Sequence, residues 1–264
     1  MQSLDSVTIV DVDGIRCGEE PLFLISGPCV IEDRDLMLET AEELCKISGK
    51  LNLPLIFKSS FQKDNRSAPE NYRGPGLEKG LEILYEIKDQ FDVPVISDVH
   101  HPDQAGPASD VLDVIQIPAF LCMQTDLAEA VGKTGRVINV KHGQFVSPEN
   151  MHQPVEKIEY VENHLVVDPR SFFDMRQVGY PVVFDITHSI RKYGIPSKDP
   201  AGGNREYLPV LGRTGVAAGV DGLFIEAHPN PPEARCDAAS QIYLNDLEEY
   251  LKPLLEINAL VKNL

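Results

Sequence analysis

The sequence has little positive charge for its size. Its 264 residues include 24 Lys and Arg against 41 Asp and Glu, which gives a formal net charge of −17 at pH 7. Because nucleic-acid backbones and anionic membranes attract basic surfaces, this balance argues against either as a general partner. A small anionic substrate is still compatible with it, since such a ligand needs only a local basic pocket.

Long apolar runs and targeting signals are also missing. No apolar stretch approaches the roughly 20 residues that a membrane-spanning helix requires. Residues 1–20 are acidic and lack the basic-then-apolar order of a signal peptide. The five cysteines are an odd number and widely scattered, so we expect reduced thiols rather than a disulfide framework. These features predict a soluble, cytoplasmic enzyme.

The chain alternates between short apolar runs and stretches with helical spacing of apolar residues. The runs are continuously apolar at their starts, which is typical of parallel strands buried on both faces. Neither a GxGxxG nor a GxxxxGK[ST] motif occurs, so a nucleotide-binding doubly wound fold loses support. We therefore predict one TIM-barrel domain of the (β/α)8 class over residues 1–264. The predicted strands are 23–29, 55–60, 95–100, 114–119, 137–143, 182–188 and 223–229, and the predicted helices are 33–51, 76–91, 125–133 and 241–263.

Every predicted strand ends in polar or reactive side chains. Such residues can simply mark where one strand stops, but the carboxyl ends of all TIM-barrel strands share the active-site face. Seven polar ends therefore favour a single site over seven unrelated strand ends. The residues are Cys29, Lys58, Asp98, His100, Gln116, Lys141, His142, Asp185, His188, Glu226 and His228.

A divalent metal site is one chemistry that these residues could supply. One thiolate, one imidazole and two carboxylates suit zinc, iron or manganese. A lone cysteine in a Gly-Pro-Cys sequence is more often a packing residue, and other histidines remain alternative ligands. The candidate set is Cys29, His188, Glu226 and Asp237, and the alternatives are His100, His101, His142 and His228.

Anion binding is the second chemistry. Several cations punctuate the Gly-, Pro- and Ser-rich stretch after the second predicted strand, and another ends the fifth. In an acidic protein, cations gathered at strand ends favour a phosphate or carboxylate ligand, although a loop of this kind can also be merely solvated. These cations are Lys58, Lys63, Arg66, Arg73 and Lys141.

A series of long motifs resembles the 3-deoxy-manno-octulosonate 8-phosphate synthase family. In chain order they are FKSSFQKDNRS, NYRGPG, SDVH, DVIQIPAFL, QTDL, VINVK, GQFVSP, VFDITHS and GLFIEAHP. The resemblance implies a (β/α)8 barrel, usually tetrameric, that condenses phosphoenolpyruvate with arabinose 5-phosphate for lipopolysaccharide biosynthesis. A related synthase that uses erythrose 4-phosphate, and a catalytically silent barrel that binds sugar phosphate, are the alternatives.

The resemblance also implies roles for individual residues. It assigns the metal-dependent class, with Cys29, His188, Glu226 and Asp237 as ligands of a divalent ion. It implies catalytic roles for Lys58, Lys63, Asp98, Lys141 and His188, with Lys141 holding the phosphate of phosphoenolpyruvate. It places Asn65, Arg66 and Ser67 at the sugar phosphate, and Gln116, Pro118 and Ala119 with Asp98 at the pocket floor.

Three features depart from the family pattern. The sixth barrel strand and its phosphate-binding arginine have no counterpart near Tyr160–Asn163, and the interval from Val137 to Val182 is short for two strand-to-strand repeats. Either this strand is deleted or the printed chain lacks a segment; we expect the latter, because losing a central strand would expose unpaired backbone. Met123 replaces an arginine of the family, and Cys236 before Asp237 is typical of metal-independent members.

Overall fold

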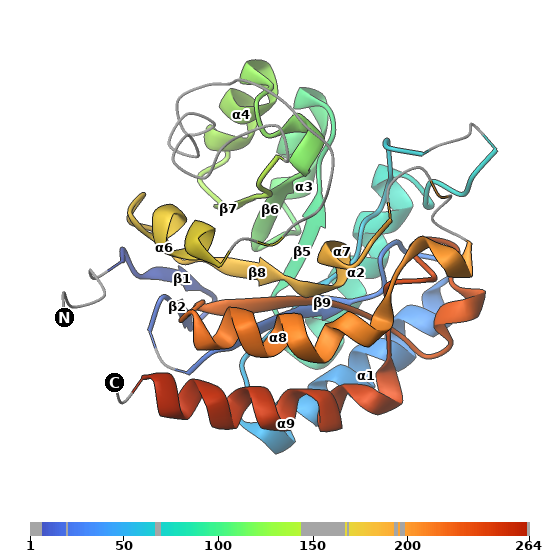
Figure 1. Cartoon of the computed structure of the whole chain (residues 1–264). Coiled ribbons are helices and arrows are strands. Elements are labelled where there is room, and N and C mark those ends of the chain that lie inside the picture. The colour runs from blue at the N-terminus through green and yellow to red at the C-terminus, as the bar shows by residue number, and fades with distance from the viewer. Residues whose placement is uncertain are drawn as a thin grey trace.

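Parallel strands form the centre of the computed structural model, which describes residues 7–19, 21–66, 70–143, 167, 169–192, 195 and 199–262. The neighbouring strands follow the order β7, β6, β5, β4, β3, β9, β8, and the short β10 also pairs with β9. All seven predicted strands are present, which confirms the (β/α)8 barrel class (Figure 1). Their bounds are β3 Phe23–Gly27, β4 Leu55–Lys58, β5 Val95–Asp98, β6 Val114–Ile117, β7 Val137–Val140, β8 Val183–Asp185, β9 Gly222–His228 and β10 Ile242–Tyr243.

The barrel is open between β7 and β8 as far as the described residues go. The sheet begins at β7 and ends at β8, and no backbone pairing between these two strands occurs within the described ranges. Residues 144–166 and 168, which include Tyr160–Asn163, lie outside the described residues. Seven of the eight strands of the barrel class are therefore accounted for.

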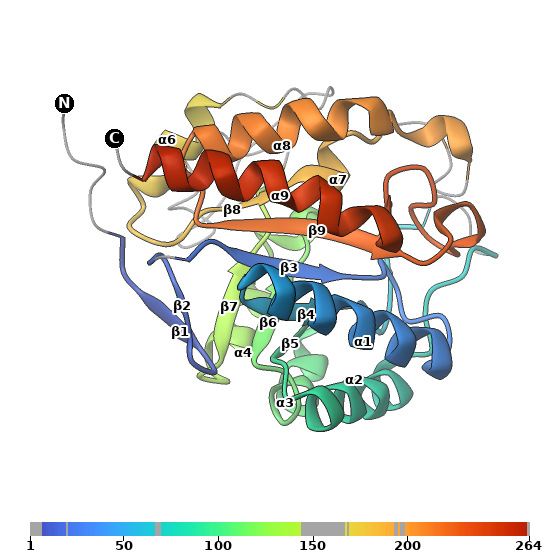
Figure 2. The same cartoon turned by 90° about the horizontal axis from the view of Figure 1, so that it is seen from below.

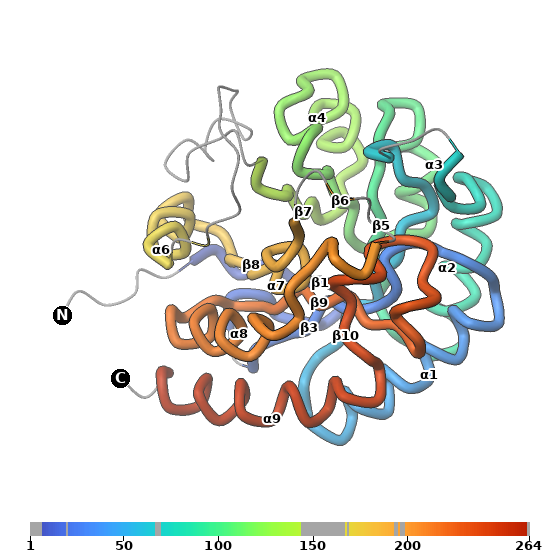
Figure 3. The backbone as a smooth tube through the Cα atoms, turned by 45° about the vertical axis from the view of Figure 1, so that its right-hand side comes forward, coloured from blue at the N-terminus to red at the C-terminus, as the bar shows by residue number. Residues whose placement is uncertain are grey.

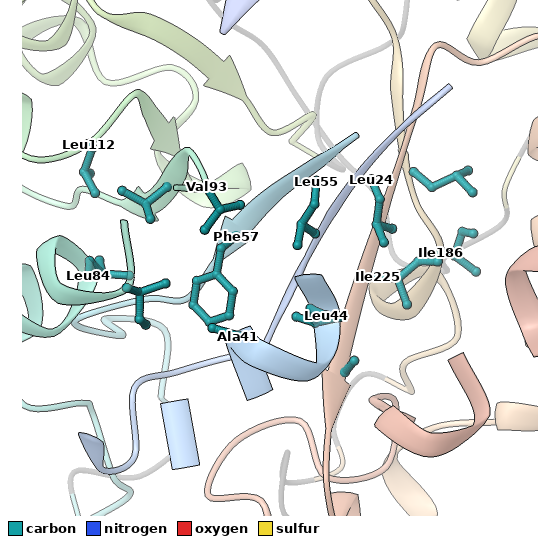
Figure 4. Packing of buried hydrophobic residues seen from close by; sticks show 14 of the residues in the cluster. Leu24, Ala41, Leu44, Leu55, Phe57, Leu84, Val93, Leu112, Ile186 and Ile225 are labelled. Atoms are coloured by element: carbon teal, nitrogen blue, oxygen red, sulfur yellow. The ribbon is translucent and has the colours of Figure 1, made fainter. Parts of the chain in front are cut away.

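Helices cover the outside of this sheet. In Figure 3, α1, α2, α3, α4, α8 and α9 surround the strands. The close-up in Figure 4 shows Ala41 and Leu44 of α1 facing Leu24, Leu55 and Phe57 of the sheet, and all five are buried. The helices are α1 Arg34–Leu51, α2 Leu77–Phe91, α3 Ala105–Ser109, α4 Thr125–Gly132, α6 Arg170–Arg176, α7 Ile186–Ser189, α8 Leu208–Ala217 and α9 Leu244–Val261, with 3-10 turns at Pro102–Gln104, Ala119–Leu121, Pro200–Gly202, Arg205–Tyr207 and Pro231–Glu233.

Local capping explains where two of these elements begin. Asp33 accepts a hydrogen bond from the Leu36 backbone N–H at 2.9 Å, which starts α1 where the sequence predicted it. The sixth predicted strand, 182–188, ends earlier than predicted, because Asp185 accepts from the His188 N–H at 3.0 Å and starts α7. His188 therefore lies on a helical turn and not on a strand.

An N-terminal hairpin closes the end of the barrel opposite to the polar strand ends. Its strands β1 Val10–Val12 and β2 Ile15–Cys17 pair antiparallel. Val12 and Cys17 pack against the inward-facing Phe23 and Ile25 of β3. Figure 2 shows the hairpin beside the start of β3. The polar strand ends therefore lie at the end of the barrel that this hairpin does not cover.

Among the described helices, none has the length and apolar character needed to cross a bilayer.

Candidate functional site

The candidate site is a polar layer directly above the apolar interior of the barrel. Side chains at positions i and i+2 of a strand share one face, so the inward-facing apolar residues fix which polar residues follow them into the barrel. The apolar–polar pairs are Ile56 and Lys58, Ile96 and Asp98, Val114 and Gln116, and Phe224 and Glu226. The polar residue of each pair is buried.

Lys58 and Glu226 form a buried ion pair across this layer. Lys58 Nζ lies 3.1 Å from Glu226 Oε1 and also donates to the Cys29 backbone carbonyl at 3.2 Å. Burial alone would raise the pKa of Glu226, but His188 and Lys58 outweigh it and lower that pKa. The carboxylate therefore stays charged at neutral pH.

Asp98 is the centre of a second network. Ser60 Oγ donates to Asp98 Oδ2 at 2.7 Å, Lys63 Nζ donates at 3.3 Å, and Gln116 donates to the other oxygen. Asn139 in turn donates to Gln116 Oε1 at 2.8 Å. Burial disfavours the charged form of Asp98, but Lys63 and Lys58 outweigh burial and hold its pKa far below the usual value. Asp98 is therefore a fixed carboxylate that positions an ammonium group.

The four predicted metal ligands meet at Asp237, which belongs to two groups of possible ligands, one with Cys29 and one with His188 and Glu226. Asp237 Oδ2 lies 3.2 Å from Cys29 Sγ and 3.5 Å from His188 Nε2, and His188 Nε2 lies 3.6 Å from Glu226 Oε1. Glu226 Oε2 is buried and has no hydrogen-bond partner among the described residues. A buried carboxylate oxygen without a donor is costly unless a cation meets it, so this donor set fits a divalent ion.

Lys141 and Asp185 meet at the ends of β7 and β8. Lys141 Nζ contacts Asp185 Oδ2, and the same oxygen lies 2.8 Å from His188 Nδ1. Burial and the nearby Lys58 lower the pKa of Lys141 to about 7. One carboxylate thus connects a titrating lysine to a candidate metal ligand.

Comparison with known proteins establishes the family of this chain. The family model described as the DAHP synthetase I family matches residues 6–164 and 159–263. The chain belongs to this family. It is 46% identical to a 2-dehydro-3-deoxyphosphooctonate aldolase of Geotalea daltonii (96% of this chain, 98% of the relative), 47% identical to one of Pelobacter propionicus (95% and 98%) and 45% identical to one of Fusobacterium nucleatum (98% and 99%).

The same comparisons bear on the expectation that one family strand has no counterpart in this sequence. The family model matches in two pieces that overlap at residues 159–164, the part of the sequence to which that expectation refers. About 253 residues of this chain (0.96 × 264) align over 269 positions with the Geotalea relative, so about 16 positions (269 − 253) stand opposite gaps in this chain.

Not every residue that the family resemblance selected reaches the polar layer. Arg66 does, since its Nη1 lies 3.0 Å from Cys236 Sγ. Asn65 is exposed, and its side chain accepts from Arg66 at 3.3 Å. Pro118 is buried and begins the 3-10 turn that contains Ala119, after the end of β6. Ser67 lies outside the described residues.

The alternative histidine ligands do not join the cluster. Two groups of possible ligands occur among the described residues, and neither contains a histidine other than His188. His101 instead lies 3.1 Å from Asp64, and the buried His228 lies 3.7 Å from Glu32.

Sequence reasoning missed several members of the site. Asn139 was hidden inside the predicted fifth strand, although its inward register could have been counted from the apolar Val137. Arg191, whose Nη1 lies 2.6 Å from Asp237 Oδ1, follows the His188 turn as one more cation near a strand end. Gln241 forms hydrogen bonds with the backbones of Cys29 and Cys236, and nothing in the sequence around it indicates a role in the site. Met123, where the family resemblance led us to expect an arginine, is buried in a small cluster with Cys122 and the partly buried Val140.

Proposed function

We propose that this protein condenses phosphoenolpyruvate with arabinose 5-phosphate and water, giving 3-deoxy-manno-octulosonate 8-phosphate and inorganic phosphate. The observation that carries this proposal is 45–47% identity, over nearly the whole chain, to relatives named 2-dehydro-3-deoxyphosphooctonate aldolase. In this reaction C3 of phosphoenolpyruvate attacks the sugar aldehyde, water adds at C2, and cleavage of the C–O bond expels phosphate.

The cations of the polar layer suit two anionic substrates. Lys58, Lys63 and Lys141 all approach the barrel interior, and Arg66 adds a guanidinium at its rim. In a largely water-excluded site, such positive groups stabilise phosphate and carboxylate charge far better than in water. We propose that Lys141 binds the phosphate of phosphoenolpyruvate and that Arg66, with Asn65 and Ser67, binds the sugar phosphate.

The remaining polar residues orient these cations and the reacting atoms. Because Asp98 stays ionised, we propose that it holds Lys63 in place and does not donate a proton. Lys141 titrates near neutral pH, so it can exchange a proton with the departing phosphate. Gln116, fixed by Asp98 and Asn139, and the neighbouring Pro118 and Ala119 form the floor beneath the enolpyruvate.

We propose that Cys29, His188, Glu226 and Asp237 hold a divalent ion of zinc, iron or manganese. When bound, this ion would supply a Lewis acid that polarises the aldehyde of the acceptor sugar. His188 is kept in orientation for this role by Asp185, which lies on its other ring nitrogen.

A phosphate-release assay tests the function. Purified protein is incubated with phosphoenolpyruvate alone, with added arabinose 5-phosphate, and with added erythrose 4-phosphate, each with and without a chelator. We expect release that depends on arabinose 5-phosphate. Release only with erythrose 4-phosphate would assign the related synthase, and no release with any metal would leave a sugar-phosphate-binding barrel. Turnover insensitive to the chelator would contradict a catalytic metal.

We further propose that the protein works as a homotetramer in the cytoplasm. Its five cysteines are free, which suits a reducing compartment. Light scattering after size-exclusion chromatography tests the assembly, and a monomeric mass would contradict it.

A further inference from the structure

Cys236 lies against the candidate metal ligands, although the family resemblance gives it no role there. Its Sγ lies 2.8 Å from Cys29 Sγ, which itself lies 3.2 Å from Asp237 Oδ2. The ligand atoms of these three buried residues lie within 4.8 Å of one another. We propose that Cys236 is a metal ligand, so that the site binds its ion through two thiolates. This inference rests on the metal site of the proposed function.

The local backbone explains how two consecutive residues face one point. In an extended chain the side chains of Cys236 and Asp237 would point to opposite sides. Asp237 has a φ of 50°, a left-handed conformation that aspartate tolerates better than most residues. The resulting turn directs both side chains towards Cys29.

One buried glutamine fixes the two cysteine backbones relative to each other. Gln241 accepts a hydrogen bond from the Cys29 N–H at 3.4 Å and donates to the Cys236 carbonyl at 2.8 Å. Gln241 is only 1% exposed, so neither bond competes much with water. The pair of thiols is therefore held by the fold and does not depend on a mobile loop.

The sulfur separation is compatible with ligation after a small adjustment. A disulfide bond is about 2.05 Å long, and both cysteines are free thiols here. Two sulfurs at about 2.3 Å from one zinc ion lie about 3.8 Å apart if the S–Zn–S angle is close to tetrahedral. The observed 2.8 Å would have to widen by about 1 Å, which is within the reach of side-chain rotation.

Two arginines lie against these donors. Arg66 Nη1 lies 3.0 Å from Cys236 Sγ, and Arg191 Nη1 lies 2.6 Å from Asp237 Oδ1. Their positive charges partly offset the negative charge that several anionic ligands would bring to one site. Arg191 also occupies one oxygen of Asp237, so the other oxygen faces Cys29 and His188.

A second thiolate ligand should make the site more selective among divalent metal ions. Soft sulfur ligands favour zinc and cobalt over manganese and magnesium, which prefer oxygen. We therefore expect the protein to retain zinc in competition with manganese, and Cys236→Ser to weaken that preference.

Cobalt spectroscopy tests the assignment without using enzyme activity. Reduced protein is loaded with Co²⁺, and the thiolate-to-cobalt charge-transfer absorption in the near ultraviolet is measured for wild type, Cys236→Ser, Cys29→Ser and Cys45→Ser. We expect the intensity to fall to about half in each of the first two variants, because each removes one of two thiolates. Cys45→Ser, on α1, is the matched control and should keep wild-type intensity.

Two further measurements keep the outcome decisive. Circular dichroism on the same samples checks folding, and cobalt X-ray absorption counts the sulfur neighbours in the wild-type protein. A folded Cys236→Ser protein with wild-type intensity, or a single sulfur neighbour in the wild type, would overturn the assignment. If the wild type shows two sulfur neighbours but releases no phosphate from any substrate pair, the proposed function fails while Cys236 remains a ligand.

Discussion

Lys141 Nζ contacts Asp185 Oδ2 across the opening of the barrel, where no backbone pairing joins β7 to β8 among the described residues. The two side chains lie at the ends of β7 and β8, and 44 positions separate them in the sequence. Asp185 also lies 2.8 Å from His188 Nδ1. One carboxylate therefore contacts both the proposed phosphate-binding lysine and a proposed metal ligand.

Replacing Asp185 by asparagine should weaken metal binding. Asparagine can still cap α7 by accepting from the His188 N–H, but it removes the negative charge beside the imidazole. Loss of such a supporting carboxylate typically lowers metal affinity by about 10- to 100-fold. Competition with a chromophoric chelator measures this affinity. Asp103→Asn, an exposed aspartate in a 3-10 turn, is the control, and equal affinities in both variants would contradict a role for Asp185.

The affinity for phosphoenolpyruvate should fall as pH rises through about 7. Lys141 has its pKa lowered to about 7 by burial and Lys58, so the free protein loses this positive charge above that pH. Below it the ammonium is retained and the phosphate is bound. Calorimetric titrations from pH 6 to pH 9 measure the effect in the wild type and in Lys141→Arg. The arginine variant should have a flatter profile because guanidinium stays protonated; identical slopes would contradict the prediction.

Cys29→Asn should reduce the metal content of the purified protein. Asparagine removes a thiolate from the donor set and places a neutral amide beside Asp237, 3.2 Å from the original sulfur. Elemental analysis after dialysis against a weak chelator checks this, with Cys122→Ser as a buried control outside the candidate site. Wild-type metal content in Cys29→Asn would remove Cys29 from the site.

Arg176→Met should strongly destabilise the fold. Two nitrogens of Arg176 each lie 2.8 Å from an oxygen of Asp221, and this pair attaches α6 to the start of β9. Removing one partner of a buried ion pair costs about 3–5 kcal/mol, because the other charge is left buried. Urea unfolding measures the loss. Arg16→Met breaks an exposed pair with Glu19 and should leave the midpoint unchanged, whereas Arg176→Met/Asp221→Leu should recover part of the loss.

Much of the barrel could be predicted because its strands are buried on both faces. Continuous apolar runs identified β3 to β9, and their polar ends identified Lys58, Asp98 and Glu226 as residues of one layer. The β1–β2 hairpin was missed because three-residue strands carry little periodic signal, although Asp13–Gly14 is a common turn pair and both residues have positive φ.

Contacts between distant parts of the chain were beyond sequence reasoning. Cys29 and Cys236 are 207 positions apart, and nothing in either local motif indicates that their sulfurs meet. In the sequence, Cys236 stood out only as a feature typical of metal-independent members, in a chain otherwise assigned to the metal-dependent class. The turn at Asp237 and the hydrogen bonds of Gln241 bring it into one site with Cys29, where the two sulfurs lie 2.8 Å apart.

The apolar residues below the polar layer keep solvent away from the charges in that layer. Ile56, Ile96 and Phe224 place hydrocarbon directly beneath Lys58, Asp98 and Glu226, so little solvent screens these charges from one another. A change of charge at one of these residues should therefore change the electrostatic energy of the others. The effects of single substitutions in this layer should be strongly non-additive when the substitutions are combined.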